Sequence, residues 1–141
     1  MSHSMSRVFV HLVWSTKHRA PMIDESLDRP LRELFVSRSA KMGAELLEFG
    51  AFDDHVHLAL RIPLSRSISD LVCAFKSESA VVLGRSIATA FRWQTGYGAF
   101  SVDSDNLDPV LRYVASQRQH HSHGTTHALW EQIARDDELI G

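Results

Sequence analysis

The chain has 141 residues, 44% of them hydrophobic and 23% charged, with a formal net charge of −2 at pH 7. These values are typical of a single globular domain over residues 1–141 and exclude a disordered or strongly basic chain. The single Cys73 excludes an intramolecular disulfide framework, and its place in an apolar helical pattern predicts a buried thiol in a reducing cytoplasm. Since no signal segment or membrane-length apolar run is seen, we expect a cytoplasmic protein with no membrane partner.

The first half of the chain predicts three strands and one helix. Residues 7–15 are apolar, β-branched and aromatic, which favours a buried strand. A helical stripe of apolar residues then runs from about Asp24 to Gly43, a glycine placed to end the helix. Residues 44–52 and 55–62 read as two strands so close in sequence that they favour an antiparallel hairpin.

The second half predicts two further helices around one short strand. Ser67 and Asp70 have the spacing of a capping box, and the helix that they open is expected to end at Gly84. Residues 99–102 read as a strand. Asp108 and Pro109 then predict a helix start, with the helix itself over 110–121. One more short helix is expected after about residue 127.

The order β-α-β-β-α-β-α indicates an α+β fold, the ferredoxin-like split βαβ sandwich. In that fold an antiparallel sheet has two helices on one face. The first strand and the strand 55–62 are expected to be neighbours in the middle of the sheet. The last helix, which carries Tyr113, could cover the other face.

Two histidines stand out in the strand 55–62. Side chains alternate along a strand, so Val56 and Leu58 would face the core while His55 and His57 share the opposite face. Two neutral imidazoles side by side could hold one metal ion. The alternative is a pair of surface or hydrogen-bonded histidines. His11, in the first strand, is interpreted as a sheet histidine with a hydrogen-bond partner.

The last predicted helix carries a second pair of candidates. Tyr113 and Gln117 are four residues apart, which places them one turn apart on the same helix face. A tyrosine can attack phosphorus, and an amide oxygen can bind a hard cation such as Mg²⁺ or Mn²⁺. By spacing alone, a packing tyrosine and a surface amide remain the alternative. A second histidine cluster is interpreted mainly as polar surface, and His121 is the member expected near the site. The cluster consists of His120, His121, His123 and His127.

Four motifs occur in an order that resembles a known family. They are Asp54-His55-Val56-His57-Leu58, Ser67-Ile68-Ser69-Asp70-Leu71-Val72, Trp93-Gln94-Thr95-Gly96-Tyr97-Gly98-Ala99-Phe100-Ser101-Val102 and Tyr113-Val114-Ala115-Ser116-Gln117. Together, from about Phe9 to His121, they resemble the IS200/IS605 transposases, the TnpA-like single-tyrosine group of the HUH nucleases.

The resemblance implies a role for each matched residue. His55, His57 and Gln117 would bind Mg²⁺ or Mn²⁺, and Tyr113 would be the nucleophile. The reaction would cleave and rejoin single-stranded DNA at hairpin-bearing ends through a 5′-phosphotyrosine. A homodimer with shared active sites is implied as well. We expect hairpin contacts from four basic residues: Lys17, Arg19, Lys76 and Arg85.

Two other functions remain open at this stage. A domesticated relative, similar to the REP-associated tyrosine transposases, would use the same residues to nick repeat hairpins. A catalytically vestigial protein would bind hairpin DNA without cleaving it. The slightly acidic chain departs from expectation, because a surface that handles DNA should be locally basic.

Overall fold

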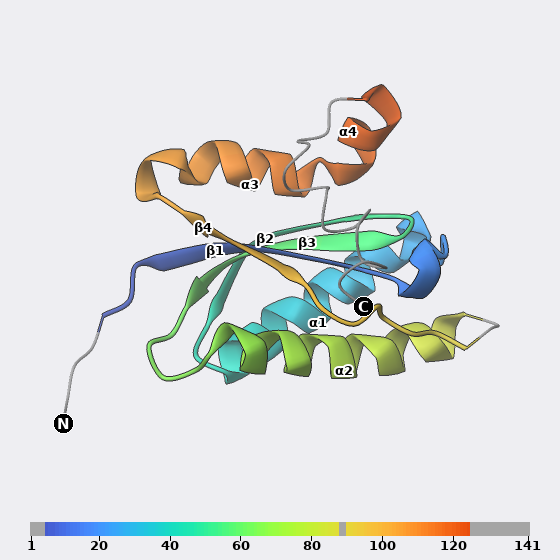
Figure 1. Ribbon diagram of the computed structural model, residues 1–141, viewed down its shortest axis with the longest axis horizontal. Helices are drawn as coiled ribbons and strands as arrows, with labels where there is room; N and C mark the ends of the chain where they lie inside the picture. Colours follow the sequence, from blue (N-terminus) through green and yellow to red (C-terminus); the bar gives the residue numbers. More distant parts are fainter. Residues whose placement is uncertain (1–4, 88–89, 125–141) are drawn as a thin grey trace.

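The computed structural model describes residues 5–87 and 90–124. Its centre is one antiparallel sheet of four strands in the order β2-β3-β1-β4 (Figure 1). The two central strands are β1 (Val8–Ser15) and β3 (His55–Ile62), and the edge strands are β2 (Glu45–Phe52) and β4 (Gly98–Val102). The predicted hairpin and the predicted central pair are both confirmed.

The helices form a layer on each face of the sheet. In Figure 1, α1 (Asp28–Lys41) and α2 (Ile68–Ser86) lie below the sheet, and α3 (Leu107–Ala115) and α4 (Gln117–His123) lie above it. Three short 3₁₀ turns complete the described elements: Lys17–Arg19, Glu25–Leu27 and Ser104–Asn106. The predicted split βαβ sandwich is confirmed, with its second sheet face covered by the C-terminal helices.

The main core lies between the sheet and the α1–α2 layer. Trp14 of β1 is fully buried there and packs edge-on against Phe35 of α1 while its ring stacks on Phe75 of α2. Val56, Leu58 and Leu60 join this core, as the alternation along β3 predicts. Their burial turns the even-numbered positions of β3 toward α1 and α2, and leaves its odd-numbered positions on the opposite face.

A smaller apolar cluster holds α3 on that opposite face. Ala59 of β3 packs with Val110 and Val114 of α3, all of them buried. The cluster is next to the two histidines in sequence, because Ala59 follows His57 by two residues on the same side of the strand. Burial of this cluster therefore fixes α3 over the histidine face.

Several local predictions are confirmed and others are wrong. Ser67 Oγ accepts a hydrogen bond from the Asp70 amide, as the capping box predicts, and Gly43 follows α1 with a positive φ of 78°. However, α2 continues past Gly84 to Ser86.

Cys73 is exposed, not buried. The buried stripe of α2 passes through Leu71, Phe75 and Ser79 at intervals of four residues. Since residues two positions apart do not share a helix face, Cys73 lies on the other side of α2.

The predicted helix over 110–121 is two helices. The first begins at Leu107, three residues earlier than predicted and ahead of the Asp108-Pro109 pair, and ends at Ala115. Ser116 then leaves the helical conformation (φ −108°, ψ 31°) before α4 begins at Gln117. The predicted helix after residue 127, and His127 itself, lie outside the described residues. Within the described residues, no helix is long and apolar enough to cross a membrane.

Candidate active site

The strand register brings three histidines to the face under α3 and α4. His57 is paired with Val13 across the β1–β3 ladder, and His11 is paired with Ala59, so the two histidines are diagonal neighbours on one face. His55, opposite Ser15, lies on the same face. All three imidazoles are at most 1% exposed, so they form a buried polar row.

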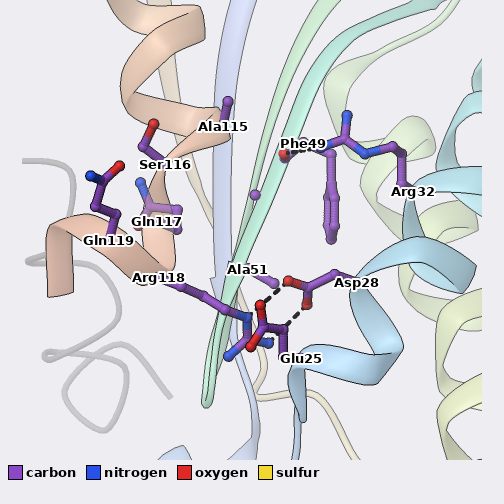
Figure 2. A pocket seen from close by; sticks show the side chains of 11 residues that line it. Glu25, Asp28, Arg32, Phe49, Ala51, Ala115, Ser116, Gln117, Arg118 and Gln119 are labelled. Carbon is purple, nitrogen blue, oxygen red and sulfur yellow. Dashed lines mark hydrogen bonds and ion pairs between the residues drawn. The ribbon is translucent and has the colours of Figure 1, made fainter. Parts of the chain in front are cut away.

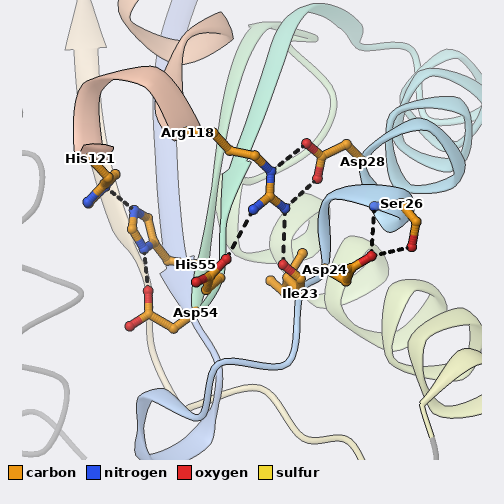
Figure 3. Close-up of polar contacts among 9 residues, drawn as sticks. Ile23, Asp24, Ser26, Asp28, Asp54, His55, Arg118 and His121 are labelled. Carbon is orange, nitrogen blue, oxygen red and sulfur yellow. Dashed lines mark hydrogen bonds and ion pairs between the residues drawn. The ribbon is translucent and has the colours of Figure 1, made fainter. Parts of the chain in front are cut away.

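Each candidate ligand histidine has a partner at its Nδ1 atom. His55 Nδ1 lies 2.7 Å from Asp54 Oδ1, and His57 Nδ1 lies 2.7 Å from His11 Nε2 (Figure 3 shows the first pair). A bond at Nδ1 fixes the ring and leaves Nε2 as the nitrogen that can bind a metal. The predicted hydrogen-bond partner of His11 is therefore the second histidine of the motif.

Asp54 is held in its charged form between two bases. Its second oxygen lies 3.4 Å from the Arg19 guanidinium. Burial of the carboxyl group opposes ionisation, but the hydrogen bond with His55 and the nearby positive charge of the Arg19 guanidinium outweigh it, so the pKa of Asp54 lies below its usual range. The ionised carboxyl group of Asp54 therefore lies on the Nδ1 side of the His55 ring.

Tyr113 reaches the histidine row from α3. Its ring lies edge-on to His57 with the centroids 5.9 Å apart, and its other side stacks on His120 at 4.7 Å. The residue is 9% exposed. The predicted nucleophile and the predicted ligand His57 therefore lie together within one chain.

Gln117 is also buried against the site, although it begins a new helix. Its Nε2 donates to the Tyr113 carbonyl oxygen at 2.9 Å, which keeps the amide next to the end of α3. Among the described residues its Oε1 accepts no hydrogen bond, and the residue is 1% exposed. A buried amide oxygen without a donor costs free energy and is suited to a cation.

Gly50 permits this packing. It lies opposite His57 in the β2–β3 ladder, directly beneath the end of α3. A Cβ atom built on Gly50 would stand 1.7 Å from the Val114 carbonyl oxygen and 3.0 Å from Gln117 Cγ. Only glycine allows the α3 backbone to approach β2 so closely.

His121 lies nearer to the site than a surface histidine would. Its Nε2 is 3.1 Å from His55 Nε2 (Figure 3), and its ring stacks on Phe52 at 4.2 Å. The sequence placed His121 near the site but did not indicate that it contacts His55. Of the rest of that cluster, His120 stacks on Tyr113.

Arg118 anchors α4 to the body of the domain. Its guanidinium bonds both oxygens of Asp28 at 2.8 Å, Asp53 at 3.1 Å and the Ile23 carbonyl at 3.0 Å (Figure 3). The bonds to Asp28 raise the pKa of Arg118 above its usual value. This four-bond contact was not foreseen from the sequence, which offered no signal that a basic residue of the last helix would meet α1.

A polar cavity of about 280 Å³ lies beside this anchor, between α1, β2 and the α3–α4 junction (Figure 2). Arg118, Gln117 and Arg32 are among its lining residues. The cavity therefore borders the candidate site on the side of Gln117.

The candidate metal ligands on this face are two imidazoles and one amide oxygen. Within 5–87 and 90–124, no group of three or more His, Cys, Asp or Glu side chains is arranged to hold a metal. Two supported imidazoles, His55 and His57, together with the buried oxygen of Gln117 are what this face offers. Such a mixed nitrogen and oxygen set leaves positions open, as a catalytic site for Mg²⁺ or Mn²⁺ requires.

The four basic residues predicted to contact DNA come from two elements, the turn after β1 and helix α2. Arg19, in the turn after β1, contacts Asp54 at the site, and Lys17 lies exposed two residues earlier. Lys76 and Arg85 belong to α2, on the other side of the sheet (Figure 1). Lys76 Nζ also donates to the carbonyl oxygens of Gln94 and Gly96, which gives it a structural role.

Comparison with known proteins identifies the family. The family model described as "Transposase IS200 like" matches residues 4–117, which include every candidate catalytic and metal-binding residue. The chain belongs to the IS200-like transposase family. The resemblance stated from the four motifs is thereby confirmed, and the protein is a member of a family of enzymes that move DNA.

Known transposases resemble this chain in sequence and in structure. The ISDra2 transposase TnpA of Deinococcus radiodurans is 25% identical over 114 residues, which are 76% of this chain and 81% of that protein. A crystal structure of a transposase from the same organism has a TM-score of 0.64 at 22% identity and covers 83% of this chain and 96% of that one.

A second solved structure, the REP-associated tyrosine transposase bound to a REP hairpin, also has a TM-score of 0.64. Its identity is 12%, and the match covers 89% of this chain and 74% of that one. At these identities the two structures support the fold of the IS200-like transposase, the antiparallel sheet between two helical layers.

Proposed function

We propose that this transposase cleaves and rejoins single-stranded DNA through a covalent bond between Tyr113 and a 5′-phosphate. The observation that carries the proposal is the position of Tyr113, buried and edge-on to His57 in the same site as Gln117. A phenol beside a candidate metal site is the arrangement that nucleophilic attack on a phosphodiester requires.

Each candidate residue has a separate role in the proposed reaction. His55, His57 and Gln117 would hold Mg²⁺ or Mn²⁺, which when bound polarises a phosphate oxygen and stabilises the charge that develops on it. Tyr113 Oη forms a bond to phosphorus and loses its proton to solvent. The bond from phosphorus to the 3′ oxygen breaks, and that oxygen takes up a proton. The bond energy is retained in the phosphotyrosine, so a 3′-hydroxyl can reverse the step and join another strand.

Access to the site requires a movement of α4. His55, His57 and Gln117 are at most 1% exposed, and His121 occupies the nitrogen of His55 that would face the metal. A DNA strand therefore enters only when α4 shifts and the His121 contact to His55 is replaced. We propose that the protein works as a homodimer with shared active sites, in which the second copy holds α4 in this shifted position while α3 keeps Tyr113 beside His57.

Hairpin-bearing DNA is the proposed substrate. The REP-associated relative was solved with a REP hairpin, and a similar fold supports the same class of ligand here. Lys17 and Arg19 lie at the end of β1 close to the site, so they are the best placed of the four basic residues to contact the strand that enters it. A host-serving hairpin nickase would use the same site.

Incubation with a hairpin-bearing single strand and Mn²⁺ tests the proposal. We expect a nicked strand and a protein–DNA adduct that survives denaturation. Tyr113→Phe should abolish the adduct while hairpin binding persists. Hairpin binding by the wild type without any cleavage or Mn²⁺ binding would favour the vestigial function instead.

A further inference from the structure

His11 and His57 form a buried imidazole pair across the two central strands. His11 Nε2 lies 2.7 Å from His57 Nδ1, and the two rings stack with centroids 4.9 Å apart at 26°. Both side chains are fully buried, and Phe100 of β4 packs 5.9 Å from His11 on its other side. Neither ring can turn away without disturbing the sheet face.

One proton lies between these two nitrogens, and its position decides what His57 can do. If His57 Nδ1 carries the proton and donates it to His11 Nε2, the neutral His57 ring presents a lone pair at Nε2. If His11 Nε2 carries the proton, a neutral His57 holds its own proton at Nε2 and cannot bind a cation there. The metal-binding form of His57 therefore requires His11 to be the acceptor.

We propose that His11 is a positioning residue that fixes the metal-binding tautomer and the ring orientation of His57. Asp54 has the equivalent place behind His55, with its carboxylate at Nδ1. A buried imidazole costs desolvation that an aliphatic residue in the same strand would avoid. The inference rests on the proposed function, because it assigns His57 Nε2 to the metal.

Metal affinity tests this inference without DNA or catalysis. His11→Leu keeps apolar bulk but removes the acceptor, whereas His11→Gln retains an acceptor oxygen of similar reach. Titration with Mn²⁺, followed by the electron paramagnetic resonance signal of the free ion, should show affinity about 10–100-fold weaker for His11→Leu. His11→Gln should restore most of the loss. His18→Asn is the matched control, since His18 is exposed in the turn after β1.

A spectroscopic measurement on the wild type complements the variants. Nitrogen chemical shifts of the His57 ring report which nitrogen carries the proton, and we expect Nδ1 to carry it in the metal-free protein. A proton at Nε2 would overturn the inference even if His11→Leu failed to fold. Thermal melts of each variant separate loss of metal binding from loss of structure.

The outcomes separate this inference from the proposed function. If His57→Ala loses Mn²⁺ and His11→Leu, when folded, binds it as tightly as the wild type, His11 has no positioning role and the proposed function stands. If His57→Ala binds Mn²⁺ like the wild type, the proposed metal site fails, and the role of His11 fails with it.

Discussion

Alanine at position 50 would drive a methyl group into the backbone that carries the candidate catalytic residues. The new Cβ would stand 1.7 Å from the Val114 carbonyl oxygen, whereas real Cβ atoms essentially never come closer than 3.0 Å to such a neighbour. The end of α3 must therefore retreat by about 1.3 Å, because neither of the two backbones can yield as a flexible side chain would. Tyr113 and Gln117 move with it.

We expect Gly50→Ala to lower the reaction rate strongly and the stability of the fold moderately. A misplacement of about 1 Å can cost about 100-fold in rate, which corresponds to about 2.7 kcal/mol of transition-state stabilisation. Overpacking lowers the free energy of unfolding by about 1–3 kcal/mol, so Gly50→Ala should remain folded at low temperature. The assay is the rate of adduct formation on a hairpin-bearing strand with Mn²⁺, measured where melts show that the variant is folded.

Gly84→Ala is the matched control. Gly84 lies within α2, and a Cβ atom there would meet nothing within 4 Å. Alanine in a helix is favoured over glycine by about 0.5–1 kcal/mol, so this variant should melt higher and react at the wild-type rate. A folded Gly50→Ala that forms the adduct as fast as the wild type would refute the argument that the close approach of α3 to β2 places the site.

Three further predictions concern the anchor of α4, the basic residues and an exposed cap. Arg118→Gln should lower the free energy of unfolding by about 1–3 kcal/mol or increase amide exchange in α4. The control Arg29→Gln removes a solvent-exposed ion pair and should change the free energy of unfolding by less than about 0.5 kcal/mol. Equal effects of the two variants would contradict the role of Arg118 as an anchor of α4. Lys76→Met should lower the melting temperature, because the variant loses two hydrogen bonds to carbonyl oxygens. Lys17→Ala should leave the melting temperature unchanged and reduce the slope of log affinity for the hairpin against log salt concentration by about one. The reverse pattern would refute a structural role for Lys76 and a DNA-binding role for Lys17. The hydrogen bonds that Ser26 donates hold the pKa of Asp24 below 3.8, so the ionised cap stabilises the fold above that pH. Asp24→Ala should therefore have a lower melting temperature than the wild type at neutral pH, and the difference should vanish as the pH falls below 3.8 through the lowered pKa. A difference in melting temperature that stays constant with pH would contradict this.

The features set by local alternation could be predicted from the sequence. The period of two along β3 correctly separates Val56, Leu58 and Leu60 from the two histidines. The antiparallel hairpin of β2 and β3 follows from their short connection. Burial on one face is enough to fix such a register, because a slip of one residue would turn every side chain to the wrong side.

Features set by distant contacts could not be predicted. The close approach of the α3 backbone at Val114 to Gly50 joins residues more than sixty positions apart in the chain. The partner of His11 follows only from the register that places it diagonal to His57. The anchor at Arg118 needs Asp28 of α1 and the turn before β3 to be brought together. None of these contacts has a signature in local propensity.

The chemical linkage at Tyr113 tests the account most directly. Wild-type protein is incubated with a hairpin-bearing strand and Mn²⁺, and the adduct is digested with protease and nuclease and analysed by mass spectrometry. The account predicts that the peptide containing Tyr113 carries a nucleotide through its 5′-phosphate and that the released strand ends in a 3′-hydroxyl. Cleavage that leaves no nucleotide on the protein, or an adduct on another residue, would contradict it.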